Sequence, residues 1–371
     1  MTQKHQHGGN VWRIAREMGK SPGDLLDFSA NINPLGPPRS VGKRLQDCTE
    51  TINCYPDPEY LRLREDIARL HDVPLECISA GNGASEILYL LAQVLSPEKI
   101  LVLAPTFSEY EKAVKAHNPE STVQRLHLSK EAEFRLTDSL IEKVKDAVGR
   151  EKIDCIFLCR PNSPTGTKIM LDVVEELAQV VSGTGTHMVI DESFLPCTQD
   201  WPENSAVKLT RRFPNIVVVT SLTKIFSIPG LRIGYLVGQT KLLRQMEKKQ
   251  PPWAVNMMAA CAARTGLADS GFVMDTQQWL PEVRKSLSQS LDSLCGIRTF
   301  PSEANFLLLE LSDPCSPESA GKRLQSRLLQ QGIMVRNCCT YPGLDENFIR
   351  VAVRKKEDNC ELVRAISKIG L

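Results

Sequence analysis

The middle of the chain alternates short apolar runs with amphipathic segments, and this alternation constrains the fold more than any other feature. The apolar runs predicted to be buried strands are Ile100–Leu103, Ile153–Cys159, His187–Ile190, Ile216–Val219 and Ile233–Val237. Apolar residues recur at helical spacing in the intervening Ser85–Leu95 and Leu171–Val181. Strands without polar alternation are covered on both faces, so the pattern predicts an α/β fold with a mostly parallel central sheet.

The pattern changes after about Asp269, where a smaller α+β domain is expected. Two helical stretches flank three strand candidates there, and these five segments are Leu280–Leu294, Ser319–Gln331, Asn305–Leu311, Ile333–Arg336 and Phe348–Val353. The first residues are turn-rich and too short for a domain of their own. We therefore expect residues 1–45 to pack on the small domain and cover the functional site, residues 46–268 to form the large domain, and residues 269–371 the small one.

Charge and cysteine usage exclude several classes of function. The 371 residues carry 45 Lys+Arg against 44 Asp+Glu, a balance that indicates neither a nucleic-acid nor a membrane-surface partner. The twelve cysteines are scattered without a CxxC pair, and the N-terminus lacks an apolar signal segment, so a cytoplasmic protein with reduced thiols is expected. The six histidines lack the spacing of metal ligands, and no metal site is predicted.

The run Thr220-Ser221-Leu222-Thr223-Lys224 carries the clearest chemical signal. Lys224 lies among hydroxyl residues, with Arg232 eight positions further on and Gly234 close behind. An amine in this setting suits the aldehyde of pyridoxal phosphate, with which it can form a Schiff base. The hydroxyls and the guanidinium can hold a phosphate dianion beside it.

Other candidates follow predicted strands, where open α/β sheets bind their ligands. The small residues 80–85 open a helix whose free backbone N–H groups favour an anion. Phe107 can stack on a flat ring, the Asn162 amide can bind a ring oxygen, and Asp191 can keep a pyridine nitrogen protonated. Taken singly, these positions are also typical of a glycine turn, a core aromatic, a plain turn and a helix cap.

Together, in this order along the chain, these motifs resemble the fold type I, aspartate-aminotransferase-like family of pyridoxal-phosphate enzymes over nearly the whole chain. The resemblance implies that Lys224 and Asp191 are catalytic, as the Schiff-base lysine and the partner of the ring nitrogen, while Asn162 binds the ring hydroxyl and Phe107 stacks on the ring. It also implies a set of residues around the cofactor phosphate, namely Gly83, Ala84, Ser85, Ser221, Thr223 and Arg232.

Two further features of the resemblance concern Tyr55 and Phe194. Tyr55 resembles the family's tyrosine that reaches the cofactor phosphate of a neighbouring subunit, which implies a homodimer with shared active sites. Many relatives carry a tyrosine where this chain has Phe194, so the phenol contact to the ring hydroxyl is missing.

A narrower resemblance starts at His7-Gly8-Gly9-Asn10 and continues through residues 27–36. There the chain resembles the threonine-phosphate decarboxylase subfamily, which serves cobamide (vitamin B12) synthesis. This implies decarboxylation of O-phospho-L-threonine to (R)-1-aminopropan-2-yl phosphate for the nucleotide loop. The residues that it implies for the substrate are His7, Gly8, Asn31, Asn162 and Arg336, with His7, Asn31 and Arg336 on the phosphate, and Arg350 on the α-carboxylate.

Three alternatives remain open at the level of sequence. O-phospho-L-serine differs from the threonine substrate by one methyl group, which a pocket distinguishes by only ~1–3 kcal/mol; its decarboxylation would give ethanolamine phosphate. An aminotransferase acting on histidinol phosphate would use the same residues in a slightly different pose. A non-catalytic binding protein could keep the fold alone, although the intact Lys224, Asp191 and Arg232 argue against it.

Overall fold

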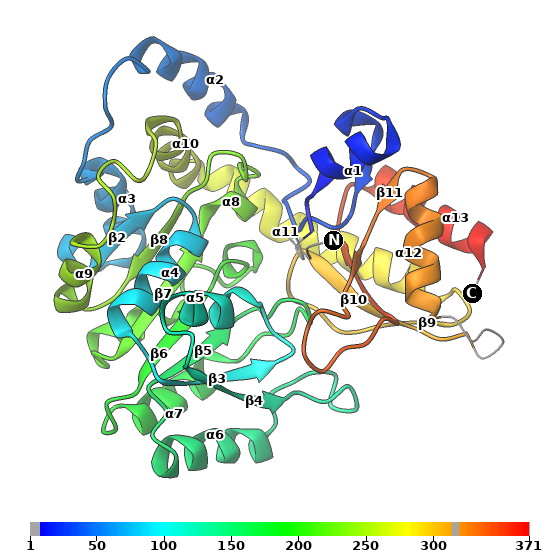
Figure 1. Cartoon of the computed structure of the whole chain (residues 1–371). Helices are drawn as coiled ribbons and strands as arrows, with labels where there is room; N and C mark the ends of the chain where they lie inside the picture. Colours follow the sequence, from blue (N-terminus) through cyan, green and yellow to red (C-terminus); the bar gives the residue numbers. More distant parts are fainter. Residues whose placement is uncertain (1–7, 314–318, 371) are drawn as a thin grey trace.

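Two sheets organise the chain in the computed structural model, which describes residues 8–313 and 319–370 (Figure 1). The larger has the strand order β2-β8-β7-β6-β5-β3-β4, and β8 alone runs antiparallel to its neighbours. Its strands are β2 (Ile78–Gly81), β3 (Lys99–Ala104), β4 (Thr122–His127), β5 (Cys155–Cys159), β6 (His187–Asp191), β7 (Ile216–Ser221) and β8 (Gly234–Val237). The prediction of an α/β fold with a mostly parallel sheet is confirmed.

Helices cover both faces of this sheet because neighbouring strand residues point to opposite sides. Val217 and Val219 belong to an apolar cluster with α4, α5 and α9, whereas Ile216 and Val218 belong to the cluster that contains α6 and α7. The helices of this part are α3 (Leu61–His71), α4 (Ala84–Leu95), α5 (Glu109–His117), α6 (Asp138–Arg150), α7 (Leu171–Val181), α8 (Leu222–Ile225), α9 (Thr240–Glu247) and α10 (Met257–Ala268). Short 3-10 turns connect several elements, at η1 (Pro22–Asp24), η2 (Thr49–Thr51), η3 (Leu75–Cys77), η4 (Leu195–Cys197) and η5 (Ala206–Arg211).

The second sheet is antiparallel, in the order β12-β13-β10-β9, and carries the helices of the C-terminal part. Its elements are α11 (Ser270–Asp292), β9 (Ile297–Thr299), β10 (Phe306–Leu311), α12 (Ala320–Gln330), β12 (Arg336–Asn337), β13 (Phe348–Ala352) and α13 (Lys356–Ile369). The α+β character predicted after about Asp269 is present, with the change falling between α10 and α11. The domain boundaries at residues 45 and 268 stay predictions.

The N-terminal segment joins this second part through a two-stranded parallel sheet of β1 (Leu26–Asp27) and β11 (Ile333–Met334). Figure 1 shows α1 (Val11–Met18), in blue, beside the orange and red elements of the C-terminal part. The next helix, α2 (Arg39–Cys48), packs on α10 of the large part. The segment therefore bridges the two parts of the molecule.

Several predicted elements differ from the observed ones for physical reasons. The expected strand Ile333–Arg336 is divided between β11 and β12, because its two halves pair with different partners. The helix predicted over Leu280–Leu294 begins earlier, at Ser270, and contains Pro281. Strand β4 was not predicted, since its residues at the sheet edge are exposed or half-buried and show no apolar run. In the described ranges, no helix is both long enough and apolar enough to cross a membrane.

The parallel strands end at one edge of the sheet and bring distant residues together there. Phe107 follows β3, Asp191 ends β6, and Lys224 lies one turn beyond β7. The N-terminal segment reaches the same edge, where the Asn33 N–H donates to the Lys224 carbonyl at 3.2 Å and its side-chain amide donates to the carbonyl of Ile225 at 2.8 Å. Strand ends, N-terminal segment and second sheet thus converge on one place.

A buried ion pair fixes the loops beneath this edge. The Arg160 and Glu192 side chains are 0% and 1% exposed, and their charged atoms lie 2.8 Å apart. Arg160 also donates to the Ile169 carbonyl and to two oxygens of Asn204. A buried charge loses its hydration, so each partner depends on the other for compensation.

We predict that Arg160→Met lowers the free energy of unfolding by ~3–5 kcal/mol, because it leaves the Glu192 carboxylate buried and unpaired. Urea denaturation followed by circular dichroism measures the change. Arg150→Met is the matched control, since it breaks a pair with Asp146 whose side chains are 79% and 63% exposed and is expected to cost less than ~1 kcal/mol. Equal losses in the two variants would contradict the prediction.

Candidate active site

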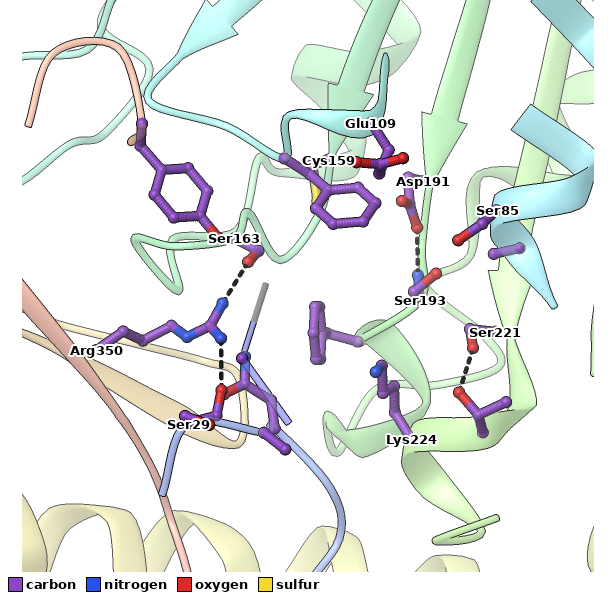
Figure 2. A pocket seen from close by; sticks show the side chains of 18 of the residues that line it. Ser29, Ser85, Glu109, Cys159, Ser163, Asp191, Ser193, Ser221, Lys224 and Arg350 are labelled. Atoms are coloured by element: carbon purple, nitrogen blue, oxygen red, sulfur yellow. Dashed lines mark hydrogen bonds between the residues drawn. The ribbon is translucent and has the colours of Figure 1, made fainter. Parts of the chain in front are cut away.

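A pocket of about 300 Å³ lies where the strand ends, the N-terminal segment and the second sheet meet (Figure 2). Eleven residues predicted from the sequence line it: Gly8, Asn31, Ala84, Ser85, Phe107, Asp191, Ser221, Thr223, Lys224, Arg232 and Arg350. They come from segments more than 300 residues apart. The fold therefore gathers most of the predicted site into one cavity.

Lys224 supplies the pocket with an amine. Its amine extends from α8 into the pocket, with Asp191 and Arg350 on other sides of the same space (Figure 2). Burial lowers the pKa of the Lys224 amine to about 8, and the positive charges of Arg232 and Arg350 contribute to the shift. A larger fraction of the amine is therefore neutral near neutral pH, which is the form that attacks an aldehyde.

Asp191 is a buried carboxylate at the end of β6. The Ser193 N–H donates to its Oδ1 and the Tyr110 hydroxyl donates to its Oδ2, each at 2.9 Å. Burial raises the pKa of Asp191, while these hydrogen bonds and the charge of Lys224 act in the opposite direction. Among the described residues it has no cation within ion-pair distance. A protonated ring nitrogen placed in the pocket would give this carboxylate the partner that buried charges require.

An anion cradle surrounds the first turn of α4. Ala84 and Ser85 open the helix, whose N-terminal N–H groups and dipole favour a phosphate. Gly83 does not line the pocket itself, but a Cβ at that position would lie 2.4 Å from the Arg232 guanidinium. Only glycine therefore leaves room for Arg232 beside the helix. Nearby, the hydroxyls of Ser221 and Thr223 lie 2.8 Å apart and complete the cradle with polar groups.

These features together fit pyridoxal 5′-phosphate. The amine of Lys224 suits its aldehyde, the carboxylate of Asp191 its ring nitrogen, and the cradle at α4 its phosphate. Phe107 lines the pocket as a ring that can stack on the pyridine.

The opposite side of the pocket offers groups for a second, acidic ligand. Arg350 is buried on β13, where its guanidinium donates to the Ser163 hydroxyl and to the Ser29 carbonyl, each at 3.0 Å (Figure 2). Its Nε and the Oδ1 of Asn31 are buried without a hydrogen-bond partner in the described part of the chain. A Cβ at Gly8 would lie 2.0 Å from the Ser29 carbonyl oxygen, so glycine is required for this close approach.

Besides Gly83, three of the described residues that the sequence predicted do not line the pocket. Asn162 is buried beside it and donates both amide N–H groups within the protein, to the Pro105 carbonyl at 2.8 Å and the Thr165 hydroxyl at 2.9 Å. Contact with the ring hydroxyl would require one of these bonds to exchange. His7 lies outside the described residues.

Arg336 and Tyr55 are the other two. Arg336 donates to the Thr340 hydroxyl at 2.7 Å and lies 5.6 Å from the ring centre of Tyr341, which itself lines the pocket. Tyr55 is 78% exposed and stacks on Trp253 with ring centres 4.4 Å apart. It contributes nothing to the pocket of its own chain.

The structure also adds residues that the sequence did not single out as site residues. Those lining the pocket are Ser29, Ala30, Glu109, Cys159, Ser163, Ser193, Phe194 and Tyr341. Ser163 and Ser193 could have been found, since they follow Asn162 and Asp191 by one and two positions. Tyr110, one helical turn beyond Phe107, is a further contact of Asp191 that required the fold to be seen.

Comparison with known proteins identifies the family. The chain is 37% identical to a threonine-phosphate decarboxylase of Salmonella typhimurium, over 98% of this chain and 96% of that protein. It is 33% identical to an adenosylcobalamin biosynthesis bifunctional protein of Leptospira interrogans, over 98% of this chain and 41% of that protein. The crystal structure of a histidinol-phosphate aminotransferase from Clostridium acetobutylicum matches with a TM-score of 0.84 at 30% identity, covering 93% of this chain and 99% of that one. Residues 23–366 match the aminotransferase class I and II model, which confirms the predicted resemblance: the chain belongs to the class I and II aminotransferase family.

Proposed function

We propose that this protein is a pyridoxal-phosphate-dependent decarboxylase that converts O-phospho-L-threonine to (R)-1-aminopropan-2-yl phosphate for the cobamide nucleotide loop. The observation that carries the proposal is 37% identity, over nearly the full length of both chains, to an enzyme named threonine-phosphate decarboxylase. The name of the Leptospira relative supports the link to cobamides. The pocket supports it too, since it combines groups for the cofactor with an arginine for a substrate carboxylate.

The cofactor-binding groups act on charge and position. Bound pyridoxal phosphate supplies an electron sink for the electron pair released when a bond at the substrate α-carbon breaks. Asp191 would keep the ring nitrogen protonated, and the cradle of Ala84, Ser85 and Arg232 would hold the phosphate. Lys224 Nζ would hold the aldehyde when substrate is absent, and once free its protonated form would supply the proton that the α-carbon takes up as carbon dioxide leaves.

The substrate-binding groups decide which bond breaks. The bond that stands perpendicular to the ring plane is the one that aligns with the π system, so orientation at the α-carbon selects the reaction. Arg350 binds the α-carboxylate, for which its planar guanidinium suits a bidentate contact. Asn31, Arg336 and His7 bind the substrate phosphate. Two anchors, one at each end of the substrate, would hold the carboxylate rather than the hydrogen out of the ring plane.

The functional unit that we propose is a homodimer with shared active sites. Tyr55 is exposed and outside its own pocket, and its stacking on Trp253 fixes its direction. An aromatic pair displayed on a surface is typical of an interface. We infer that the Tyr55 hydroxyl binds the cofactor phosphate of the partner subunit. The cytosolic location expected from the sequence stays a prediction.

A second candidate, transamination of histidinol phosphate or a similar amine, is favoured by the likeness to the Clostridium enzyme. Transamination would use the same cofactor contacts and differ in which bond at the α-carbon is aligned. O-phospho-L-serine is the alternative substrate for decarboxylation, because one methyl group distinguishes it from phosphothreonine.

We predict that the purified holoenzyme releases carbon dioxide from phosphothreonine and forms aminopropyl phosphate without consuming 2-oxoglutarate. Incubation with phosphothreonine, phosphoserine and histidinol phosphate, each with and without 2-oxoglutarate, followed by product analysis, measures this. Glutamate formation without carbon dioxide release would overturn the proposal in favour of the aminotransferase.

Arg350→Lys belongs in the same assay, because it keeps the positive charge and removes the planar fork. We expect kcat/KM for phosphothreonine to fall at least about tenfold, given that a hydrogen bond to a charged group contributes ~1.5–3 kcal/mol. An unchanged kcat/KM would show that Arg350 does not bind the substrate carboxylate.

We predict that the apoenzyme captures pyridoxal phosphate faster as the pH rises, with a midpoint near the lowered Lys224 pKa of about 8. The sign follows from the reactive form: the neutral amine attacks, and it predominates only above its pKa. Stopped-flow absorbance across pH 6–10, buffered to constant ionic strength, measures the rate. Borohydride trapping and peptide mapping confirm the site, with Lys224→Ala as the control; a midpoint above about 10 would contradict the prediction, since that is the ordinary range of a lysine.

We predict that mixing Lys224→Ala with Tyr55→Phe chains restores activity that neither variant has alone. In a hybrid dimer with shared sites, one site receives Lys224 from one chain and Tyr55 from the other. Activity after co-refolding measures the effect. The matched control is Lys224→Ala mixed with Asp191→Asn, two defects that fall on each chain's own site and leave no intact site. Absence of recovery in the first mixture would overturn the shared-site proposal.

A further inference from the structure

Tyr110 is a buried phenol that neither the family resemblance nor the proposed chemistry uses. It lies in the first turn of α5 with an exposed fraction of 0%. Its hydroxyl donates to Asp191 Oδ2 at 2.9 Å, although the two residues are 81 positions apart in the chain. The residue does not line the pocket, so its influence on a ligand would pass through Asp191.

The Tyr110 ring is held on two sides. It stacks on Phe157 of β5 with ring centres 5.2 Å apart and an angle of 12° between the planes. Its edge contact with Phe107 has ring centres 5.6 Å apart at 81°. A ring fixed in this way directs its O–H at one atom, Oδ2 of Asp191. Phe107, which can stack on the cofactor, therefore contacts Tyr110, which donates to Asp191.

The donor in this hydrogen bond is the phenol. Burial, together with the charge of Asp191, raises the pKa of Tyr110 well above its usual value, so the hydroxyl stays protonated. The neighbouring Cys159 stands opposite Asp191 in the paired strands β5 and β6. Burial also raises the pKa of its thiol, and the Cys159 Sγ lies 3.3 Å from the Pro161 carbonyl. Tyr110 is therefore the donor and Asp191 the acceptor in this hydrogen bond.

We propose that Tyr110 is a positioning residue that fixes the Asp191 carboxylate toward the cofactor ring nitrogen. The Ser193 N–H holds Oδ1 and the Tyr110 hydroxyl holds Oδ2, so neither oxygen can rotate out of place. A carboxylate held at both oxygens meets the ring nitrogen in one orientation without reorganising during the reaction. The inference rests on the proposed function, since it requires the cofactor in the pocket.

The groups that face Asp191 set the direction of the expected pH effect. Tyr110 faces it from α5, Cys159 from β5 and Lys224 from α8, and the charges of Arg232 and Arg350 lower the pKa of Lys224. Glu109 lines the same pocket. Removing the Tyr110 hydroxyl takes a hydrogen bond from the ionised form of Asp191, so the pKa of Asp191 rises. Loss of activity on acidification then begins at higher pH.

The test is Tyr110→Phe in the holoenzyme, which removes one oxygen and keeps the ring. We expect kcat to fall about 10- to 100-fold with little change in KM, and its acid limb to move up by about one pH unit. The pH midpoint of the bound cofactor's absorption band should shift in the same direction, and the cofactor should dissociate more readily. Tyr235→Phe is the matched control, because Tyr235 is equally buried and its hydroxyl is bonded to His71 outside the pocket.

A double variant decides whether Tyr110 acts through Asp191. If it does, Tyr110→Phe/Asp191→Asn is no slower than Asp191→Asn alone, because the charge on which the hydroxyl acts is already gone. Additive losses would overturn the inference, as would a folded Tyr110→Phe whose kcat and cofactor spectrum match those of Tyr235→Phe. Should Tyr110→Phe fail to fold, recovery of folding in the double variant supports the inference, and an equally unfolded double variant overturns it.

The test of Tyr110 can fail or succeed independently of the test of the proposed function. If the unmodified enzyme transaminates instead of releasing carbon dioxide, the cofactor's absorption band and its dissociation constant still report on Tyr110. If decarboxylation is found but these two properties are unchanged in Tyr110→Phe, the inference fails alone.

Discussion

The burial of one uncompensated carboxylate governs the organisation of this site. Asp191 ends a strand in the middle of a covered sheet, where water cannot solvate its charge, and the described residues give it hydrogen-bond donors but no cation within ion-pair distance. Such a group is tolerated when a positive partner arrives from outside the chain. The lowered pKa of Lys224 follows the same logic, because burial beside two arginines also disfavours its own charge. The pocket is thus prepared electrostatically for a ligand that carries a cationic ring nitrogen at one end and an anion at the other.

Parallel topology explains why these groups meet. Each parallel strand delivers its C-terminal end to the same edge, so Phe107, Asp191 and Lys224 converge although they are spread over more than a hundred residues. The antiparallel sheet and the N-terminal segment close the cavity from the other side with Arg350, Ser29 and Asn31. The groups that fit the cofactor and those that we propose for the substrate therefore come from two different layers of the fold.

The sequence predicts the central sheet because its strands follow local patterns, whereas most residues of the cofactor site were assigned through the family resemblance. Continuous apolar runs mark buried strands, and a polar residue directly after such a run marks a strand end, which is how Asp191 was found. Edge strand β4 lacks that pattern, since half-buried residues need no apolar run. The division of residues 333–337 between two sheets could not be predicted, because it depends on pairing with Leu26 and Arg350, far away in the chain. The contact of Tyr110 with Asp191 could not be predicted either, because the two residues are distant in the chain. For the same reason the sequence did not indicate that both amide N–H groups of Asn162 are bonded within the protein.

The pairing of the two chain ends has a mechanical consequence. Leu26 and Asp27 lie in one ladder with Ile333 and Met334, and the Phe28 backbone bonds to both Met334 and Ala352. Arg350 donates to the Ser29 carbonyl, so hydrogen bonds tie these groups to one another. Their tether to the cofactor side includes Asn33, whose backbone and side chain bond to α8. A hinge motion between the two layers that keeps these bonds would carry Ser29 and Arg350 together, and it would break the hydrogen bond from Arg350 to the Ser163 hydroxyl.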